Sequence, residues 1–208
     1  MDNDIIHKLL ALELFDDAID VLQISRSQLQ VLPTAKYWFQ GQKKKTRQYS
    51  DAIWDAGIEL VSECQVIYVE RDEGCLAEIE YLSQFNNQIH QGERDLILAT
   101  RSQPDFLLMT GDKVCMQALP KLSEEIFQRL MGRVVCLEQV VLILIRRLGF
   151  GVVQERVLLN VDCDKALRAC FGSGDRATED NVVLALLGYV DDLQKFAPGL
   201  LVDVEKFR

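Results

Sequence analysis

The sequence is poor in the residues that build the commonest zinc and phosphate sites. It has only two histidines, His7 and His90, and none of its six cysteines belongs to a CxxC pair, so a zinc site is poorly supported. We expect the cysteines to be buried free thiols. There is also no glycine-rich phosphate loop, which argues against a phosphatase-like or nucleotide-binding α/β enzyme.

Long hydrophobic runs are missing as well. The longest, at 134–145, is interrupted by Glu138 and Gln139 and falls well short of the roughly 20 residues that span a bilayer. The first residues, Met1 to Asp4, are acidic where a secretory signal would be basic. We therefore expect a soluble, cytoplasmic protein with no membrane partner.

Positive charge is scarce relative to negative charge. The net charge of −9 argues against a protein that clamps nucleic acid without regard to sequence, because attraction to phosphate needs a positive field. It leaves room for a metal-dependent nuclease, whose site concentrates carboxylates and whose bound divalent ions invert the local potential.

What the sequence does contain is a series of short apolar runs separated by helical patterns. We expect strands near 28–32, 64–69, 106–109 and 134–137. Strands that alternate with helices predict a three-layer α/β/α domain with a mostly parallel central sheet, over 1–150. Residues 151–208 are expected to form a helical extension packed on this core, with helices at 164–171 and 179–196.

Acidic residues lie in three segments of this pattern. Asp2 and Asp4 open the chain, Glu93 and Asp95 lie in the first turn of a predicted helix, and Asp112 follows the apolar strand 106–109. Ligands collect at the carboxyl edge of parallel sheets. Acids that converge there would suit Mg²⁺ or Mn²⁺, which can clamp a scissile phosphate and lower the pKa of an attacking water.

The ordered set of motifs resembles the PIN-domain ribonucleases, a fold shared by many bacterial toxins. The matching stretches are Asp2-Asn3-Asp4-Ile5-Ile6, Gly92-Glu93-Arg94-Asp95-Leu96-Ile97-Leu98-Ala99 and Phe106-Leu107-Leu108-Met109-Thr110-Gly111-Asp112-Lys113. The resemblance implies that Asp2 is the first metal-binding acid with Asp4 as its partner, that Asp95 or Glu93 is the acid at the helix start, and that Asp112 is the acid after the strand. Asp2, Asp95 and Asp112 are then the catalytic candidates.

The activity implied by the resemblance is Mg²⁺- or Mn²⁺-dependent hydrolysis of RNA, with single-stranded RNA as substrate. It also implies a toxin or defence component restrained by an inhibitory protein, and a homodimer. Thr110 and Lys113 are candidates for substrate binding, together with Lys43, Lys44 and Lys45 of a basic loop predicted at 41–48.

A second interpretation stays open. The family carries a glutamate in an early helix, but the matching stretch at 33–40 has no acid, and no strand precedes Asp2. These departures favour a catalytically degenerate PIN-like module that acts in protein–protein interaction. In that case Asp2 and Asp4 would cap the first helix. Glu93 and Asp95 would stabilise the dipole of the helix whose first turn they occupy.

Overall fold

The computed structural model describes residues 1–46 and 49–207. Helices make up 67% of the structure and strands 4%. The α-helices are α1 (Asn3–Ala11), α2 (Phe15–Val21), α3 (Ala35–Lys45), α4 (Asp51–Glu63), α5 (Glu73–Ser83), α6 (Gln91–Ala99), α7 (Lys113–Ala118), α8 (Glu124–Leu130), α9 (Leu137–Leu148), α10 (Phe150–Leu159), α11 (Lys165–Cys170) and α12 (Glu179–Phe196). Short 3-10 helices are η1 (Arg26–Gln28), η2 (Thr100–Ser102), η3 (Leu119–Lys121), η4 (Val161–Cys163), η5 (Gly174–Arg176) and η6 (Val204–Phe207).

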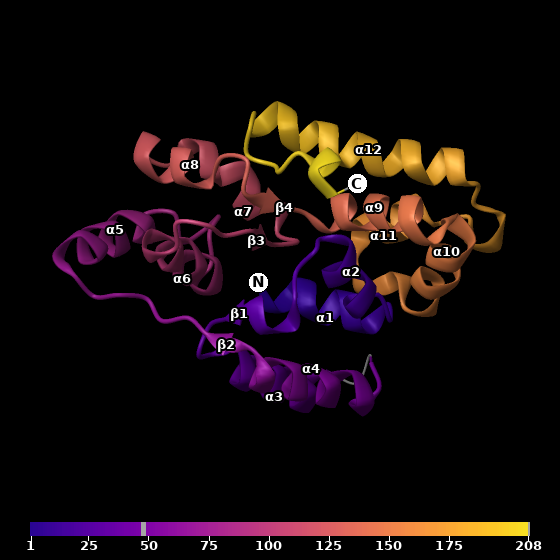
Figure 1. The fold of residues 1–208 in the computed structure, drawn as a ribbon, viewed down its shortest axis with the longest axis horizontal. Helices are drawn as coiled ribbons and strands as arrows, with labels where there is room; N and C mark the ends of the chain where they lie inside the picture. Colours follow the sequence, from indigo (N-terminus) through magenta and orange to yellow (C-terminus); the bar gives the residue numbers. More distant parts are fainter. Residues whose placement is uncertain (47–48, 208) are drawn as a thin grey trace.

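Strands are confined to two short parallel pairs in the described residues. β1 (Gln30–Val31) pairs with β2 (Gln65–Val66), and β3 (Leu108–Met109) pairs with β4 (Val134–Val135). The prediction of a three-layer α/β/α fold with a mostly parallel central sheet is therefore wrong. The protein is mostly helical, and its strands form two small sheets near the middle of the molecule (Figure 1).

The apolar runs that suggested longer strands pass quickly into helix or irregular chain. The predicted strand at 134–137 pairs only at 134–135, because α9 begins at Leu137. The run at 106–109 pairs only over its last two residues. A short apolar run fits a buried strand and the start of a buried helix equally well, so hydrophobic periodicity does not fix where pairing stops.

The first two residues of the chain lie between the two strand pairs. The amino nitrogen of Met1 donates to the carbonyl oxygen of Gln30 at 2.9 Å, and the backbone N–H of Asp2 donates to the carbonyl oxygen of Met109 at 3.0 Å. Helix α1 starts directly after these contacts. The backbone of Asp2 is thereby held at the end of β3.

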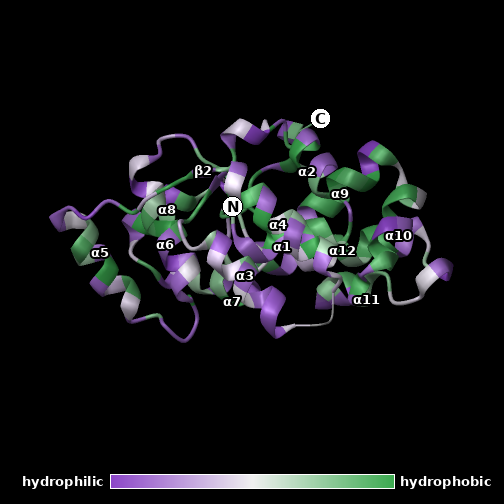
Figure 2. Ribbon diagram, turned by 90° about the horizontal axis from the view of Figure 1, so that it is seen from below, coloured by the Kyte–Doolittle hydropathy of each residue, from purple (hydrophilic) through white to green (hydrophobic). Residues whose placement is uncertain are grey.

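Helix α9 is the centre of the core. Every residue from Leu137 to Ile145 is buried, and α2, α10 and α12 pack against it. Figure 2 shows green, hydrophobic residues along α9, whereas outer helices such as α5 carry both purple and green ones. Gly149, with a φ of +89°, separates α9 from α10, and this left-handed conformation is one that glycine adopts without strain. The predicted apolar helix at 138–148 is confirmed.

The remaining helices agree with the sequence in part. Helices α11 and α12 confirm the two predicted after residue 151, and α10 was not predicted. The prediction of a loop over the basic segment 41–48 is wrong for 41–45, since α3 continues to Lys45. Arg47 and Gln48 lie outside the described residues. All six cysteines are free, and all but Cys163 are buried. No helix in the described part of the chain is long and apolar enough to cross a membrane.

Candidate functional site

A pocket of about 690 Å³ lies where the N-terminal ends of α1, α6, α7 and α11 meet. The charged residues that line it are Asp2, Asp4, Lys8, Glu93, Asp112, Lys113, Asp164 and Lys165. The structure therefore brings Asp2, Asp4, Glu93 and Asp112 together, from three segments of the chain, at one cavity. Helix N-termini add a favourable field for negative groups, because their first N–H groups carry partial positive charge.

Asp2 is placed by its backbone and by one side-chain contact. Its N–H bonds to Met109, and the hydroxyl of buried Thr110 donates to its Oδ2 at 3.4 Å. The side chain does not cap α1. Burial, and then the neighbouring charge of Asp4, raise the pKa of Asp2 to about 6. Asp2 is thus a poorly solvated carboxyl group, and the N-terminal ammonium and nearby backbone N–H groups compensate its ionised form only in part.

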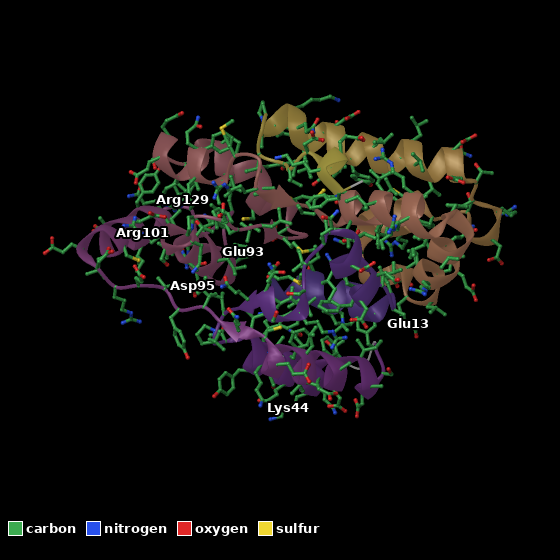
Figure 3. All side chains as sticks on the ribbon, in the orientation of Figure 1. Glu13, Lys44, Glu93, Asp95, Arg101 and Arg129 are labelled. Carbon is green, nitrogen blue, oxygen red and sulfur yellow. The ribbon has the colours of Figure 1, made fainter. Side chains whose placement is uncertain are left out.

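Helix α6 presents Glu93 to the pocket and turns Asp95 away from it. Two positions along an α-helix point to different sides, and Asp95 lines another cavity, where its Oδ1 accepts from Gln91 Nε2 at 2.9 Å. Of the two acids that the sequence left open, Glu93 is the one at this pocket. Figure 3 marks both residues on α6.

Glu93 also carries an unsatisfied atom. Its Oε2 is buried and has no hydrogen-bond partner within residues 1–46 and 49–207. Burial, and then the charges of Asp2 and Asp112, raise the pKa of Glu93 above its ordinary value. A buried carboxylate oxygen without a donor costs free energy, so the folded chain keeps an unfavourable acidic group at this place.

Asp112 has a structural role besides its place in the pocket. It is the N-cap of α7, and its Oδ1 accepts from the N–H of Cys115 at 2.9 Å. Its own N–H donates to the hydroxyl of Thr110 at 3.2 Å. Thr110, a predicted substrate-binding residue, thus contacts both Asp2 and Asp112 and positions the two acids relative to each other.

The sequence interpretation missed two residues at the pocket, Lys8 and Asp164, the N-cap of α11. The ammonium of Lys8 lies 2.6 Å from Asp4 Oδ2 and 2.9 Å from Asp164 Oδ2. Asp164 caps α11 by accepting from Ala166 and Leu167. The spacing of Asp4 and Lys8, four positions apart, was the available signal for the first pair. Nothing local links Lys8 to Asp164.

The basic candidates divide into one residue at the pocket and a group away from it. Lys113 lines the pocket, but its Nζ lies 2.6 Å from Glu138 Oε1 and 3.8 Å from the ring centre of Tyr189. Lys43 pairs with Asp55 on α4 at 2.7 Å. Lys44 and Lys45 are exposed on α3, and Figure 3 shows Lys44 at the outer edge of the molecule, away from Glu93.

The donor chemistry of the pocket suits a hard divalent cation, because every candidate ligand is an oxygen and Glu93 Oε2 is an orphaned one. Within the described residues, however, no three His, Cys, Asp or Glu side chains are grouped closely enough to hold a metal ion. Comparisons with protein-family models, curated proteins and solved structures found no match.

Proposed function

We propose that this pocket is the active site of a metal-dependent nuclease, related to the PIN-like proteins, that hydrolyses phosphodiester bonds in single-stranded RNA. The observation that carries the proposal is the convergence of Asp2, Glu93 and Asp112 on one cavity. Burial, and then the carboxylates of Asp2 and Asp112, raise the pKa of Glu93, and a divalent cation is a partner that relieves the repulsive part of this effect.

Two of the three lysines that line the pocket have other partners. Lys8 binds Asp4 and Asp164, and Lys113 binds Glu138. Asp2, Glu93 and Asp112 are thus the carboxylates left to act on Mg²⁺ or Mn²⁺, although in this structure they are not grouped closely enough to hold the ion. Thr110 fixes the backbone of Asp112 and contacts Asp2. When bound, the ion would lower the pKa of a water molecule and offset charge on the phosphate.

A second candidate function is protein–protein interaction by a module without activity. Two of the acids have structural partners, because Asp112 caps α7 and Asp4 is held by Lys8. These contacts account for both acids without any metal. The two candidates differ in one measurable property, which is dependence on divalent ions.

The test is cleavage of labelled single-stranded RNA and DNA by the purified protein with Mn²⁺, with Mg²⁺ and with chelator. We expect metal-dependent cleavage of RNA that falls on the order of 100-fold in Glu93→Gln and in Asp112→Asn, because each change removes several kcal/mol of charge stabilisation. Asparagine at position 112 still accepts from the Cys115 N–H, so the cap is kept.

Asp95→Asn is the matched control. It removes an acid from the same helical turn as Glu93, but that acid lines a different cavity, so activity should change less than about twofold. If the purified protein cleaves no nucleic acid with any divalent ion, the result would favour the protein–protein interaction module over the nuclease. An equal loss in Asp95→Asn and Glu93→Gln would show that this pocket is the wrong place.

A further inference from the structure

Strand β2 leaves one edge of its sheet open. Among the described residues it pairs with β1 alone. The N–H of Gln65 donates to the carbonyl oxygen of Leu29 at 3.0 Å. The N–H of Ile67 donates to that of Val31, also at 3.0 Å. Because backbone groups alternate in direction along a strand, the N–H and C=O of Val66 point away from β1, toward the open edge.

The chain that follows β2 is also without backbone partners. No residue from 68 to 71 makes a backbone hydrogen bond with another described residue, and Figure 1 shows this segment running along the outer side of the molecule to α5. Val66 is 44% exposed and Tyr68 69% exposed. The stretch 65–69 (QVIYV) contains no charged residue and no proline, which are common means of protecting an edge. This edge can therefore accept another strand.

The opposite edge of the same sheet is occupied. The amino nitrogen of Met1 donates to the carbonyl oxygen of Gln30 in β1, on the side that faces away from β2. The sheet can thus take a further strand beside β2 but not beside β1. A second copy that pairs through its own β2 would use up both open edges, so the assembly closes at two chains and does not grow into a filament.

We propose that β2 is the interface of a homodimer, in which two copies pair antiparallel across a twofold axis at Ile67. In this register Val66 lies opposite Tyr68 of the second copy, and the two residues exchange both of their backbone hydrogen bonds. A β-branched residue opposite an aromatic one is a favourable cross-strand pair. The two sheets join into one, with the strand order β1-β2-β2-β1.

Charge complementarity favours a second copy in this register. Glu63, the last residue of α4, would lie opposite Arg71 of the second copy, and the twofold axis repeats the pair. Both side chains are exposed, and within its own chain Glu63 has a distant contact, 3.8 Å from Arg26 Nη1. Moving the axis by one residue would set Glu63 opposite Glu73 or Val69 and lose the attraction. The edge is thus complementary to itself.

Sedimentation equilibrium of the full chain tests the proposal. We expect a dimer with a dissociation constant on the order of 10 μM, because a short strand pair buries less surface than a standard interface. Val66→Pro removes an N–H that points to the open edge, a place where a strand tolerates proline. This variant should fold and should dimerise at least about tenfold more weakly.

A charge exchange tests the register and the identity of the partner. Glu63→Arg and Arg71→Glu, each by itself, should weaken the dimer at least about tenfold, because each sets like charges opposite one another at both ends. An equimolar mixture of these two variants should form a heterodimer about as stable as the wild-type dimer, since every cross-strand charge pair in it is again attractive.

Glu155→Arg is the matched control. It makes the same change of charge at an exposed residue of α10, which Figure 1 shows far from β2. The dissociation constant should change less than about twofold, since distant exposed charges are screened. Circular dichroism and thermal unfolding show which variants are folded, and the charge exchange decides the matter if Val66→Pro does not fold.

The outcomes are distinct from those of the nuclease test. Wild-type protein that stays monomeric up to about 200 μM overturns the homodimer. A dimer that survives Val66→Pro unchanged, or a mixture of charge variants that stays monomeric, overturns β2 as its interface. In the described chain the acidic pocket is lined by other residues than those of this edge, so either proposal can fail without the other.

Discussion

The backbone N–H of Asp2 bonds to the carbonyl oxygen of Met109 at 3.0 Å, and this contact determines where the first acid of the chain lies. It holds the start of α1 against the end of β3, next to Thr110 and the turn that carries Asp112. Glu93 reaches the same cavity from α6. An acidic pocket therefore forms although the strands around it are only two residues long.

Replacing Asp2 by asparagine should make stability less dependent on pH. The pKa of Asp2 is about 6 in the folded protein, above its ordinary value of about 3.9 in an unfolded chain. The folded state then binds more protons between these values, so this group's contribution to stability is complete below about pH 4 and is lost as pH rises through about 6. Asp2→Asn should raise the free energy of unfolding at pH 8 by about 3 kcal/mol.

Urea denaturation at pH 4 and pH 8 measures this difference. The two proteins should be similar at pH 4 and should diverge at pH 8. Asp191→Asn, which changes an exposed carboxylate on α12, provides the baseline and should show no comparable divergence. Equal stabilities of the wild type and Asp2→Asn at both pH values would contradict the raised pKa of Asp2 in the folded protein.

Glu78→Gln should destabilise the fold by about 3 kcal/mol, because it removes the shared negative partner of two guanidinium groups. Buried Glu78 accepts from Arg101 at 2.7 Å and also binds Arg129. Figure 3 marks the two arginines near each other between α5 and α8. The network joins these helices to η2 through Thr100, which accepts from Arg129.

The comparison for that change is Asp192→Asn. The pair of Asp192 with Lys195 is 3.0 Å long, with side chains 65% and 74% exposed, so its loss should cost less than about 0.5 kcal/mol. Both variants are compared by urea denaturation at one pH. If Glu78→Gln is no more harmful than Asp192→Asn, the network does not hold these helices together.

Gly57→Ala should destabilise the protein by about 1–3 kcal/mol through overpacking. A Cβ atom at Gly57 of α4 would lie 2.3 Å from Cε1 of Phe39 on α3. The Phe39 ring is fully buried and packs against Trp38 and Trp54. These neighbours oppose a shift of the ring away from the added methyl group.

Gly41→Ala makes the same chemical change in α3, where a Cβ atom would meet nothing within 4 Å. Alanine is the better helix former, so this variant should gain about 0.5–1 kcal/mol. Thermal unfolding of the two proteins should therefore shift in opposite directions. A loss of stability in both would mean that the effect comes from the helix backbone and not from Phe39.

Several elements were predictable because their signals are local. The apolar pattern at 138–148 marks α9, and the patterns at 164–171 and 179–196 mark α11 and α12. The acids at the start of α6 fit a first helical turn. The strands were overestimated, because their ends depend on pairing with segments far away in the sequence, and the four-residue spacing of Asp4 and Lys8 was an unused signal.

The sequence by itself determined the helices α9, α11 and α12, that the cysteines are free thiols of which all but Cys163 are buried, and that acids stand at the starts of α1, α6 and α7. Tertiary structure alone decided that Glu93 rather than Asp95 faces the pocket and that Asp164 reaches Lys8. The physical reason is that periodicity fixes which residues share a helix face. The direction in which that face points is set by packing against other parts of the chain.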